Sequence, residues 1–158
     1  MSSGFDIKYV LLHFFQAIQV FKVSKIIAHN IDFDINMVKA ECYRILHDGT
    51  INKNFIDPHV RFITNLKNID KFCTMKKNKE RCKIVRYWDD GKKYHKFPSL
   101  LELYQHLFNE TPSNLHDAMV DVLVCVQCYA LTECQNEVQQ KLITDCRGMI
   151  ENISSNNN

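Results

Sequence analysis

The amino-acid sequence predicts an α/β fold built around one hydrophobic core. Short β-branched runs alternate with longer segments in which apolar residues recur at helical spacing, an order typical of α/β proteins. With 158 residues, of which 46% are hydrophobic, the chain is long enough for one ordinary core and short for two domains. We therefore expect a single domain over residues 1–150 and a polar, disordered tail over residues 151–158.

The first part of the chain predicts a helix, a strand and a second helix. Residues 5–21 contain no Gly or Pro and place apolar side chains at helical spacing, which indicates an amphipathic helix. Residues 23–28 are short, rich in β-branched side chains and followed by a polar turn, which indicates a buried strand. Asp32 can then cap a second helix. We expect a polar loop over residues 47–54 and a turn or short helix at residues 57–58.

A further strand and a β-hairpin are predicted in the middle of the chain. Residues 72–75 form a brief apolar run suited to a strand. Residues 81–88 and 92–97 flank Asp89-Asp90-Gly91, where the glycine permits a positive φ, so a hairpin is expected. These strands are few for a self-sufficient sheet, which indicates that part of the fold is absent.

Two helices are predicted after the hairpin. Pro98 and Ser99 begin the first, a Leu-rich segment that ends at Thr111-Pro112-Ser113. The second runs from about Leu115 to Cys134 and can continue after a kink to Ile150.

Positive charge is concentrated in one segment of a nearly balanced chain, whose formal net charge is +2. Residues 76–96 contain nine Lys or Arg and three Asp or Glu, an excess of six, so the rest of the chain is acidic by four charges. Such a segment can contact nucleic-acid phosphates, and aromatic side chains among the charges can stack on bases. Charge-rich hairpins are also often simply solvated, and this alternative stays open. The candidate nucleic-acid-binding residues are Lys76, Lys77, Lys79, Arg81, Lys83, Arg86 and Trp88, with Tyr87 and Tyr94 beside them.

The seven cysteines favour a reducing, cytoplasmic environment. Their number is odd, four lie in apolar helical contexts, and no secretory signal is evident. No apolar stretch approaches the roughly 20 residues that span a bilayer, so we expect no membrane partner. Cys73, Cys82, Cys125 and Cys128 could together ligate zinc, although small buried thiols explain the same pattern.

A histidine and an aspartate mark the start of the last predicted helix. His116 stands five residues before Asp121. Asn114 can cap this helix, and Asp117 can be a first-turn acid that faces the helix dipole. Capping does not explain Asp121, which stands among apolar residues inside the helix. Because a buried, unpaired carboxylate is costly, Asp121 should be paired, hydrogen-bonded or bound to a cation.

A second acidic group follows the first predicted strand. Asp32 and Asp34 come shortly after His29 and Asn30. Both acids can be helix caps, and His29 can be an ordinary histidine at a strand end. Open α/β sheets nevertheless bind ligands at the carboxyl ends of their strands, and Mg²⁺ takes carboxylate oxygens as ligands. Acids from two separate elements therefore make a metal site a reasonable hypothesis.

Two strings of this sequence resemble motifs of one nuclease family. Residues 26–35 (IIAHNIDFDI) resemble the second motif of the DnaQ-like, ribonuclease H-fold 3′-to-5′ exonucleases, the family of the DNA polymerase III proofreading subunit. Residues 116–122 (HDAMVDV) resemble the third motif in the version that carries a histidine. Between them, residues 72–75 (FCTM) and 97–104 (FPSLLELY) resemble the strand and the Pro-Ser-Leu helix of these proteins. The resemblance covers residues 5 to about 134.

The resemblance implies a ribonuclease H-like fold and a metal-dependent 3′-to-5′ exonuclease, a hydrolase whose cofactor is Mg²⁺ or Mn²⁺. In this family two divalent ions flank the scissile phosphate while a base deprotonates the attacking water. Asp34 and Asp121 match acidic metal ligands, and His116 matches the general base, a task that suits a group titrating near neutrality. His29 and Asn30 match positions that shape the site. The implied partner is a nucleic acid with a single-stranded 3′ end, DNA being favoured over RNA.

The first motif of this family is not found where it is expected. That motif is an Asp-x-Glu pair on the opening strand, and no such pair precedes His29, where Asp6 is the one acid. We therefore expect the opening strands of the sheet to be missing and the chain to be part of a truncated or split enzyme, which a separate chain could complete. The alternative is a catalytically inactive nucleic-acid-binding or accessory protein that retains the exonuclease fold.

Overall fold

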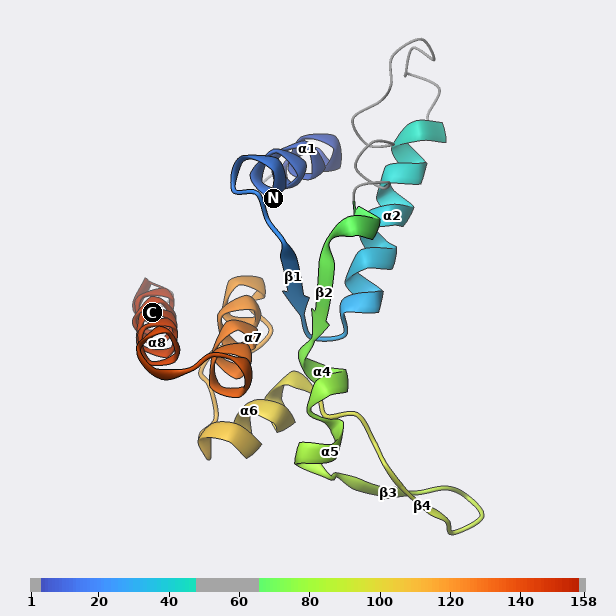
Figure 1. Ribbon diagram of the computed structural model, residues 1–158, viewed down its shortest axis with the longest axis vertical. Coiled ribbons are helices and arrows are strands. Elements are labelled where there is room, and N and C mark those ends of the chain that lie inside the picture. Colours follow the sequence, from blue (N-terminus) through green and yellow to red (C-terminus); the bar gives the residue numbers. More distant parts are fainter. Residues whose placement is uncertain (1–3, 48–65, 157–158) are drawn as a thin grey trace. The chain divides into compact units, whose positions relative to one another are not determined.

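The computed structural model describes residues 4–47 and 66–156, which form two compact units. The first unit comprises residues 4–26, 31–47 and 66–72, and the second comprises residues 27–30 and 73–156. Helices predominate and the strands are short (Figure 1), so the α/β class predicted from the sequence is confirmed. The prediction of one domain over residues 1–150 stays a prediction.

Two amphipathic helices make up most of the first unit. Helix α1 (Ile7–Val20) begins after Asp6, whose carboxylate accepts a hydrogen bond from the backbone N–H of Lys8 over 2.9 Å. Helix α2 (Ile31–His47) packs against α1 and follows strand β1 (Lys25–Ala28). Each helix buries one stripe of apolar side chains, which is why both patterns were readable in the sequence. The buried residues are Leu11 and Phe15 in α1 and Ile31, Ile35, Cys42 and Ile45 in α2.

Strand β2 (Asp70–Cys73) pairs with β1 in a two-stranded sheet and follows a short 3₁₀ turn, η1 (Leu66–Asn68). The strand predicted over residues 72–75 is placed two residues too late. It ends at Cys73 because that residue caps the next helix, its Sγ lying 3.4 Å from the N–H of Lys76. The turn predicted at residues 57–58, and the predicted loop beyond His47, lie outside the described residues.

The second unit opens with two short helices and the predicted hairpin. Helices α4 (Thr74–Lys77) and α5 (Lys79–Cys82) lead to strands β3 (Val85–Tyr87) and β4 (Lys93–His95), which pair antiparallel. Gly91 adopts φ 79° in the connecting turn, as its position predicted. The hairpin is thus confirmed, although its strands are shorter than expected.

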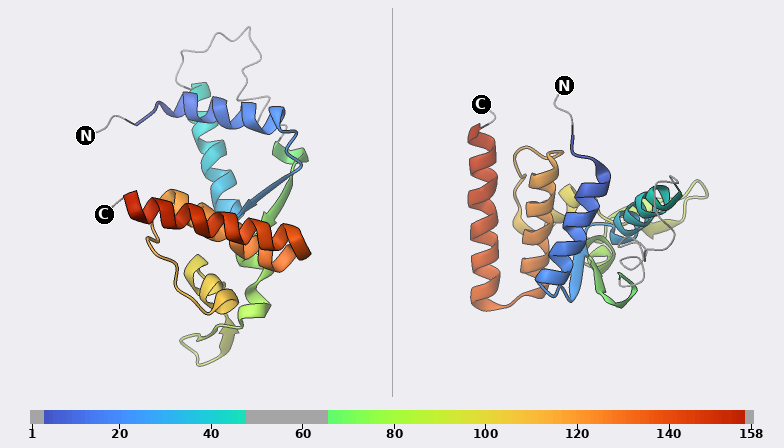
Figure 2. Two further views of the ribbon diagram at one scale, coloured as in Figure 1. Left: turned by 90° about the vertical axis from the view of Figure 1, so that its left-hand side faces the viewer. Right: turned by 90° about the horizontal axis from the view of Figure 1, so that it is seen from above.

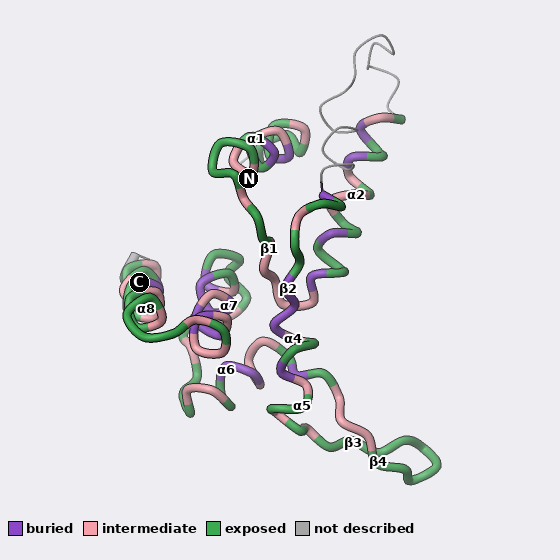
Figure 3. The backbone as a smooth tube through the Cα atoms, in the orientation of Figure 1, coloured by how far each residue is buried: buried purple, intermediate pink, exposed green. Residues whose placement is uncertain are grey.

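Three longer helices complete the second unit. Helix α8 (Asn136–Asn156) packs along α7 (Ala118–Glu133), which in turn packs on α6 (Leu100–Phe108) (Figure 2). Burial is concentrated along α7 and is low on the hairpin (Figure 3). The core cluster of this unit is Leu103, Tyr104, Val120, Leu123, Val124, Cys128, Cys146 and Ile150.

Two predictions about the carboxyl-terminal part are wrong. The last helix does not continue through a kink, because Cys134 adopts an extended conformation and a separate helix begins at Asn136. Residues 151–156 are helical rather than part of a disordered tail. Ile153 packs on the core cluster, and Ser154 Oγ accepts a hydrogen bond from Asn114 Nδ2 over 2.9 Å, so this last turn has contacts that hold it in place.

Within the described ranges, no helix is both long and apolar enough to span a bilayer. All seven cysteines lie in those ranges, and no disulfide joins any two of them.

Candidate functional site

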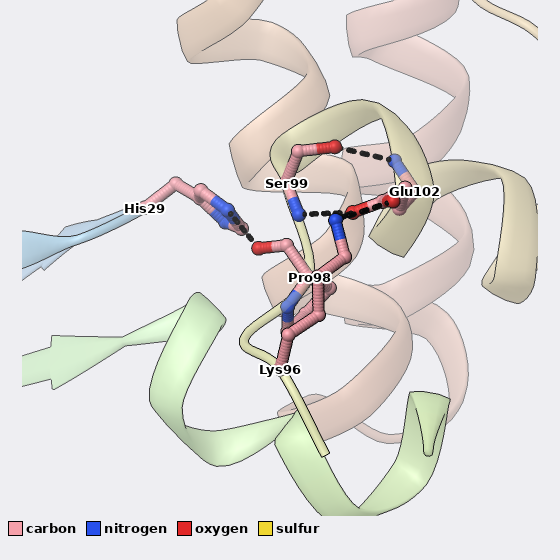
Figure 4. A network of polar contacts seen from close by, with 5 residues as sticks. All are labelled: His29, Lys96, Pro98, Ser99 and Glu102. Atoms are coloured by element: carbon pink, nitrogen blue, oxygen red, sulfur yellow. Dashed lines mark hydrogen bonds and ion pairs between the residues drawn. The ribbon is translucent and has the colours of Figure 1, made fainter. Parts of the chain in front are cut away.

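His29 connects three segments of the second unit. It follows β1 in a tight turn where Asn30 has a left-handed conformation (φ 71°), which asparagine tolerates better than most residues. His29 Nδ1 lies 3.0 Å from Thr74 Oγ1 at the start of α4. Its Nε2 lies 3.1 Å from the carbonyl oxygen of Pro98, just before α6 (Figure 4). Because a carbonyl only accepts, Nε2 is the donor there, and both ring nitrogens hold the fold.

Thr74 extends this network to α7. Its side chain is fully buried, and Oγ1 lies 3.4 Å from the carbonyl oxygen of Ala28 and 3.7 Å from Cys125 Sγ. A buried hydroxyl with several partners favours the one arrangement in which all of them are present. The end of β1 and the helix that carries Asp121 therefore meet at a single side chain. The sequence patterns did not identify this residue, because its partners lie 45 to 51 positions away along the chain.

A capping box determines where α6 begins. Ser99 Oγ accepts a hydrogen bond from the N–H of Glu102, and the Glu102 carboxylate accepts one from the N–H of Ser99 (Figure 4). Lys96 Nζ lies 2.7 Å from the same carboxylate. Burial opposes ionisation of Glu102, but the hydrogen bonds from Lys96 and Ser99 outweigh it, so the pKa of Glu102 is lowered. The carbonyl of Pro98, which accepts the hydrogen bond from His29, therefore lies next to a helix start that the capping box stabilises.

Helix α7 begins with His116, Asp117 and Asp121 close together. Asp117 is the N-cap, and its Oδ1 accepts hydrogen bonds from the N–H groups of Met119 (2.9 Å) and Val120 (3.2 Å). Asp121 lies in the first turn and is half-buried, whereas His116 is exposed. The backbone N–H of His116 donates to Asp121 Oδ1 over 3.3 Å. The histidine and the aspartate of the predicted motif are therefore neighbours in space.

The prediction that Asn114 caps this helix is wrong, as is the placement of Asp117 inside its first turn. Asn114 adopts φ 57°, and its side chain donates to Ser154 Oγ in α8. With Asn114 engaged by α8, the cap moves three residues along the chain to Asp117. His116 also has a positive φ of 82°, so two residues of this connection have positive φ before the helix starts.

The other predicted acids lie in the first unit. Asp32 and Asp34 occupy the first turn of α2 and are exposed. Asp32 is therefore not the cap that was predicted, because the helix already begins at Ile31. Carboxylates in a first turn are favoured by the partial positive charge of the helix amino terminus, which is a sufficient structural reason for both.

The described residues contain no complete cation site. In residues 4–47 and 66–156, no three His, Cys, Asp or Glu side chains form a group that could hold a metal ion. Asp34 belongs to the first unit and Asp121 to the second, so the metal site predicted from them stays a prediction. Asp121 is half-buried and accepts a hydrogen bond of 3.3 Å from the backbone N–H of His116.

The zinc alternative for the cysteines is wrong. Cys73, Cys82, Cys125 and Cys128 all lie in the second unit, yet among its described residues they form no group of three potential ligands. Burial raises the pKa of the Cys128 thiol far above its ordinary value, and the neighbouring Cys125 adds to this effect. Burial also raises the pKa of Cys82. Such thiols stay protonated and pack as small apolar groups.

The predicted nucleic-acid-binding residues fall on neighbouring segments of the second unit. Apart from Lys79, whose Nζ lies 5.0 Å from the centre of the Phe97 ring, they are exposed. Trp88 stacks on Tyr94, with ring centres 4.3 Å apart. The set comprises Lys76 and Lys77 in α4, Lys79 and Arg81 in α5, Lys83 after α5, and Arg86 and Trp88 in the hairpin.

Comparison of this chain with protein-family models, with curated proteins and with solved structures found no match.

Proposed function

We propose that this chain belongs to a metal-dependent 3′-to-5′ exonuclease of the DnaQ-like type, with a ribonuclease H-like fold. The observation that carries the proposal is the position of His116 next to Asp121 at the start of α7, where the backbone N–H of His116 donates a hydrogen bond to Asp121 Oδ1. A histidine near a carboxylate that binds a divalent ion can activate a water molecule next to a metal-bound phosphate. Divalent ions, Mg²⁺ or Mn²⁺, would polarise the phosphate and lower the pKa of the water.

The roles of the individual residues are those that the family resemblance implies. Asp121 and Asp34 would each contribute a carboxylate ligand, and His116, which is exposed, would accept the proton of the attacking water. His29 is hydrogen-bonded to Thr74 and to the Pro98 carbonyl, and it thereby fixes the end of β1 next to the starts of α4 and α6. The order of the resembling strings along the chain supports the same assignment.

The test compares the wild-type chain with Asp121→Asn on a 3′-labelled single-stranded oligonucleotide in Mn²⁺. Asparagine keeps the hydrogen bond from His116 but removes the charge, so we expect release of the 3′ label to fall at least 100-fold. Asp117→Asn is the matched control, because asparagine caps helices about as well as aspartate and the change lies four residues away. Equal loss in both variants, or equal degradation by all three proteins, would contradict the assignment.

A second function is favoured by one specific observation, the exposed stack of Trp88 on Tyr94 beside exposed basic residues of the hairpin. A catalytically inactive protein with these residues would bind a single strand and leave it intact. The same experiment separates the two functions when binding is followed beside label release. Binding that is unaffected by Asp121→Asn, with no shortening of the strand in Mn²⁺, would support the binding protein and contradict the exonuclease.

A further inference from the structure

The hairpin β3–β4 presents two faces of different composition. In its register Arg86 lies opposite Tyr94, and Tyr87 lies opposite Lys93. Residues directly opposite one another share a face, and successive residues alternate between faces. One face therefore carries Arg86, Trp88 and Tyr94, and the other carries Tyr87 and Lys93.

The first of these faces holds a preformed aromatic stack. The rings of Trp88 and Tyr94 have centres 4.3 Å apart and planes inclined by 26°. Trp88 remains 59% exposed although it is stacked on Tyr94. A large indole left this open at the tip of a short hairpin has no role in a core, and its stacking on Tyr94 limits the entropy that it would lose on binding.

Positive charge lies close to both aromatic faces. Arg86 is exposed, and within the described part of the chain it forms no ion pair. On the other face Lys93 Nζ lies 5.9 Å from the centre of the Tyr87 ring, and Tyr87 is 62% exposed. By contrast, Lys92 forms an ion pair with Asp90 within the hairpin, and Lys96 forms one with Glu102 of α6. Among the described residues of the hairpin strands, Arg86 and Lys93 are therefore the cations that form no ion pair with another described residue.

This combination fits one class of partner. Exposed aromatic rings flanked by cations match a chain of phosphates that carries flat, apolar bases, because the bases stack and the phosphates pair with the charges. A duplex does not offer this contact, since its bases are already stacked on one another. An apolar protein surface would bury Arg86 and Lys93 without a counter-charge, which is unfavourable.

We propose that the hairpin binds single-stranded nucleic acid, with a base stacked on the open face of Trp88 and phosphates contacted by Arg86 and Lys93. This inference rests on the proposed exonuclease function, and it specifies that the substrate is bound as a single strand. Its physical basis is independent of catalysis. Binding at the hairpin needs neither Asp121 nor a divalent ion.

The test uses the fact that Trp88 is the sole tryptophan of the chain. Tryptophan fluorescence of the full chain is followed in EDTA while a poly-dT single strand is added, and then a duplex of mixed sequence. We expect quenching by the single strand and little by the duplex. Quenching should weaken steeply with added salt, because phosphate contacts release counterions.

Variants assign the contact to the hairpin. Binding of a dye-labelled strand, measured by anisotropy, should weaken about 5- to 150-fold in Trp88→Ala and less in Trp88→Phe, which keeps a ring to stack on. Arg86→Gln should weaken binding several-fold and lower its salt dependence, whereas the matched control Lys141→Gln in α8 should not. Circular dichroism of each variant shows whether the fold is kept.

The outcomes separate this inference from the proposed function. Strand binding that depends on Trp88 without any Asp121-dependent hydrolysis would support the hairpin site and count against the exonuclease. Asp121-dependent hydrolysis with unchanged binding in Trp88→Ala and Arg86→Gln would do the reverse. Strand binding without a change in Trp88 fluorescence, or equal affinity for the duplex, would overturn the inference.

Discussion

The backbone N–H of His116 donates a hydrogen bond to Oδ1 of Asp121 over 3.3 Å, across the turn that begins α7. The contact uses the main chain of His116 and leaves its imidazole exposed. The aspartate therefore has a structural role that is independent of the histidine side chain. The contribution of the hydrogen bond to stability and the proposed role of the imidazole in catalysis can therefore be tested separately.

Replacing His116 by glycine should separate the two roles. The main-chain hydrogen bond to Asp121 is kept, and the positive φ of 82° suits glycine. We expect the free energy of unfolding in urea to change by less than about 1 kcal/mol. Exonuclease activity should fall about 10²- to 10⁴-fold, the usual contribution of a general base. A large loss of stability, or full activity, would show that the imidazole has a different role.

Binding of Mn²⁺ at Asp121 should be visible without any catalysis. In a ¹⁵N-labelled chain, substoichiometric Mn²⁺ should selectively broaden the amide signals of residues around 116–122, because the ion is paramagnetic. Asp121→Asn should abolish this broadening, whereas Asp145→Asn, a change of an exposed acid in α8, should leave it intact. Broadening that is insensitive to Asp121→Asn would place the ion elsewhere.

His29 and Thr74 should act as one unit in stability. His29→Ala leaves Thr74 and the Pro98 carbonyl without the ring, and Thr74→Val removes the hydroxyl while keeping the volume. Each change should lower the free energy of unfolding by about 1–3 kcal/mol. Because the two side chains share a hydrogen bond, the double variant should lose less than the sum, by about 0.5–3 kcal/mol. Strict additivity in urea denaturation would indicate that the contact contributes nothing.

Glu102 should make stability depend on pH below neutrality. Its pKa is lowered in the folded chain despite the opposing effect of burial, because Lys96 and Ser99 bind the ionised form. The stabilisation is therefore complete above the pKa of the unfolded chain and is lost as the pH falls through the lower, folded pKa. Melting temperatures of wild type and Glu102→Gln should differ at pH 7 and converge toward pH 3. A difference in melting temperature that does not change with pH would show that the ionised form of Glu102 is not what stabilises the fold.

Features set by neighbouring residues were predictable from the sequence. The hairpin around Gly91 and the start of α6 at Ser99 depend on turn and cap chemistry within a few positions, and both were predicted close to their observed places. The helical stripes of α1 and α2 were readable for the same reason, because each pattern lies within one element.

Features set by distant partners were not predictable. Asparagine is a residue type that commonly caps helices, but the Asn114 side chain donates a hydrogen bond to Ser154, forty positions away. The N-cap is therefore Asp117. Thr74 joins His29, Ala28 and Cys125, and none of these contacts follows from local spacing. The helical end of α8 likewise depends on packing against the core cluster rather than on its polar sequence.

The most direct test of the proposed activity is the pattern of products from a 5′-labelled single strand incubated with the chain and Mg²⁺ or Mn²⁺. We predict a ladder that shortens one nucleotide at a time from the 3′ end, is abolished by EDTA and is absent with Asp121→Asn. An intact strand, internal cuts without a ladder, or the same ladder from Asp121→Asn would contradict it.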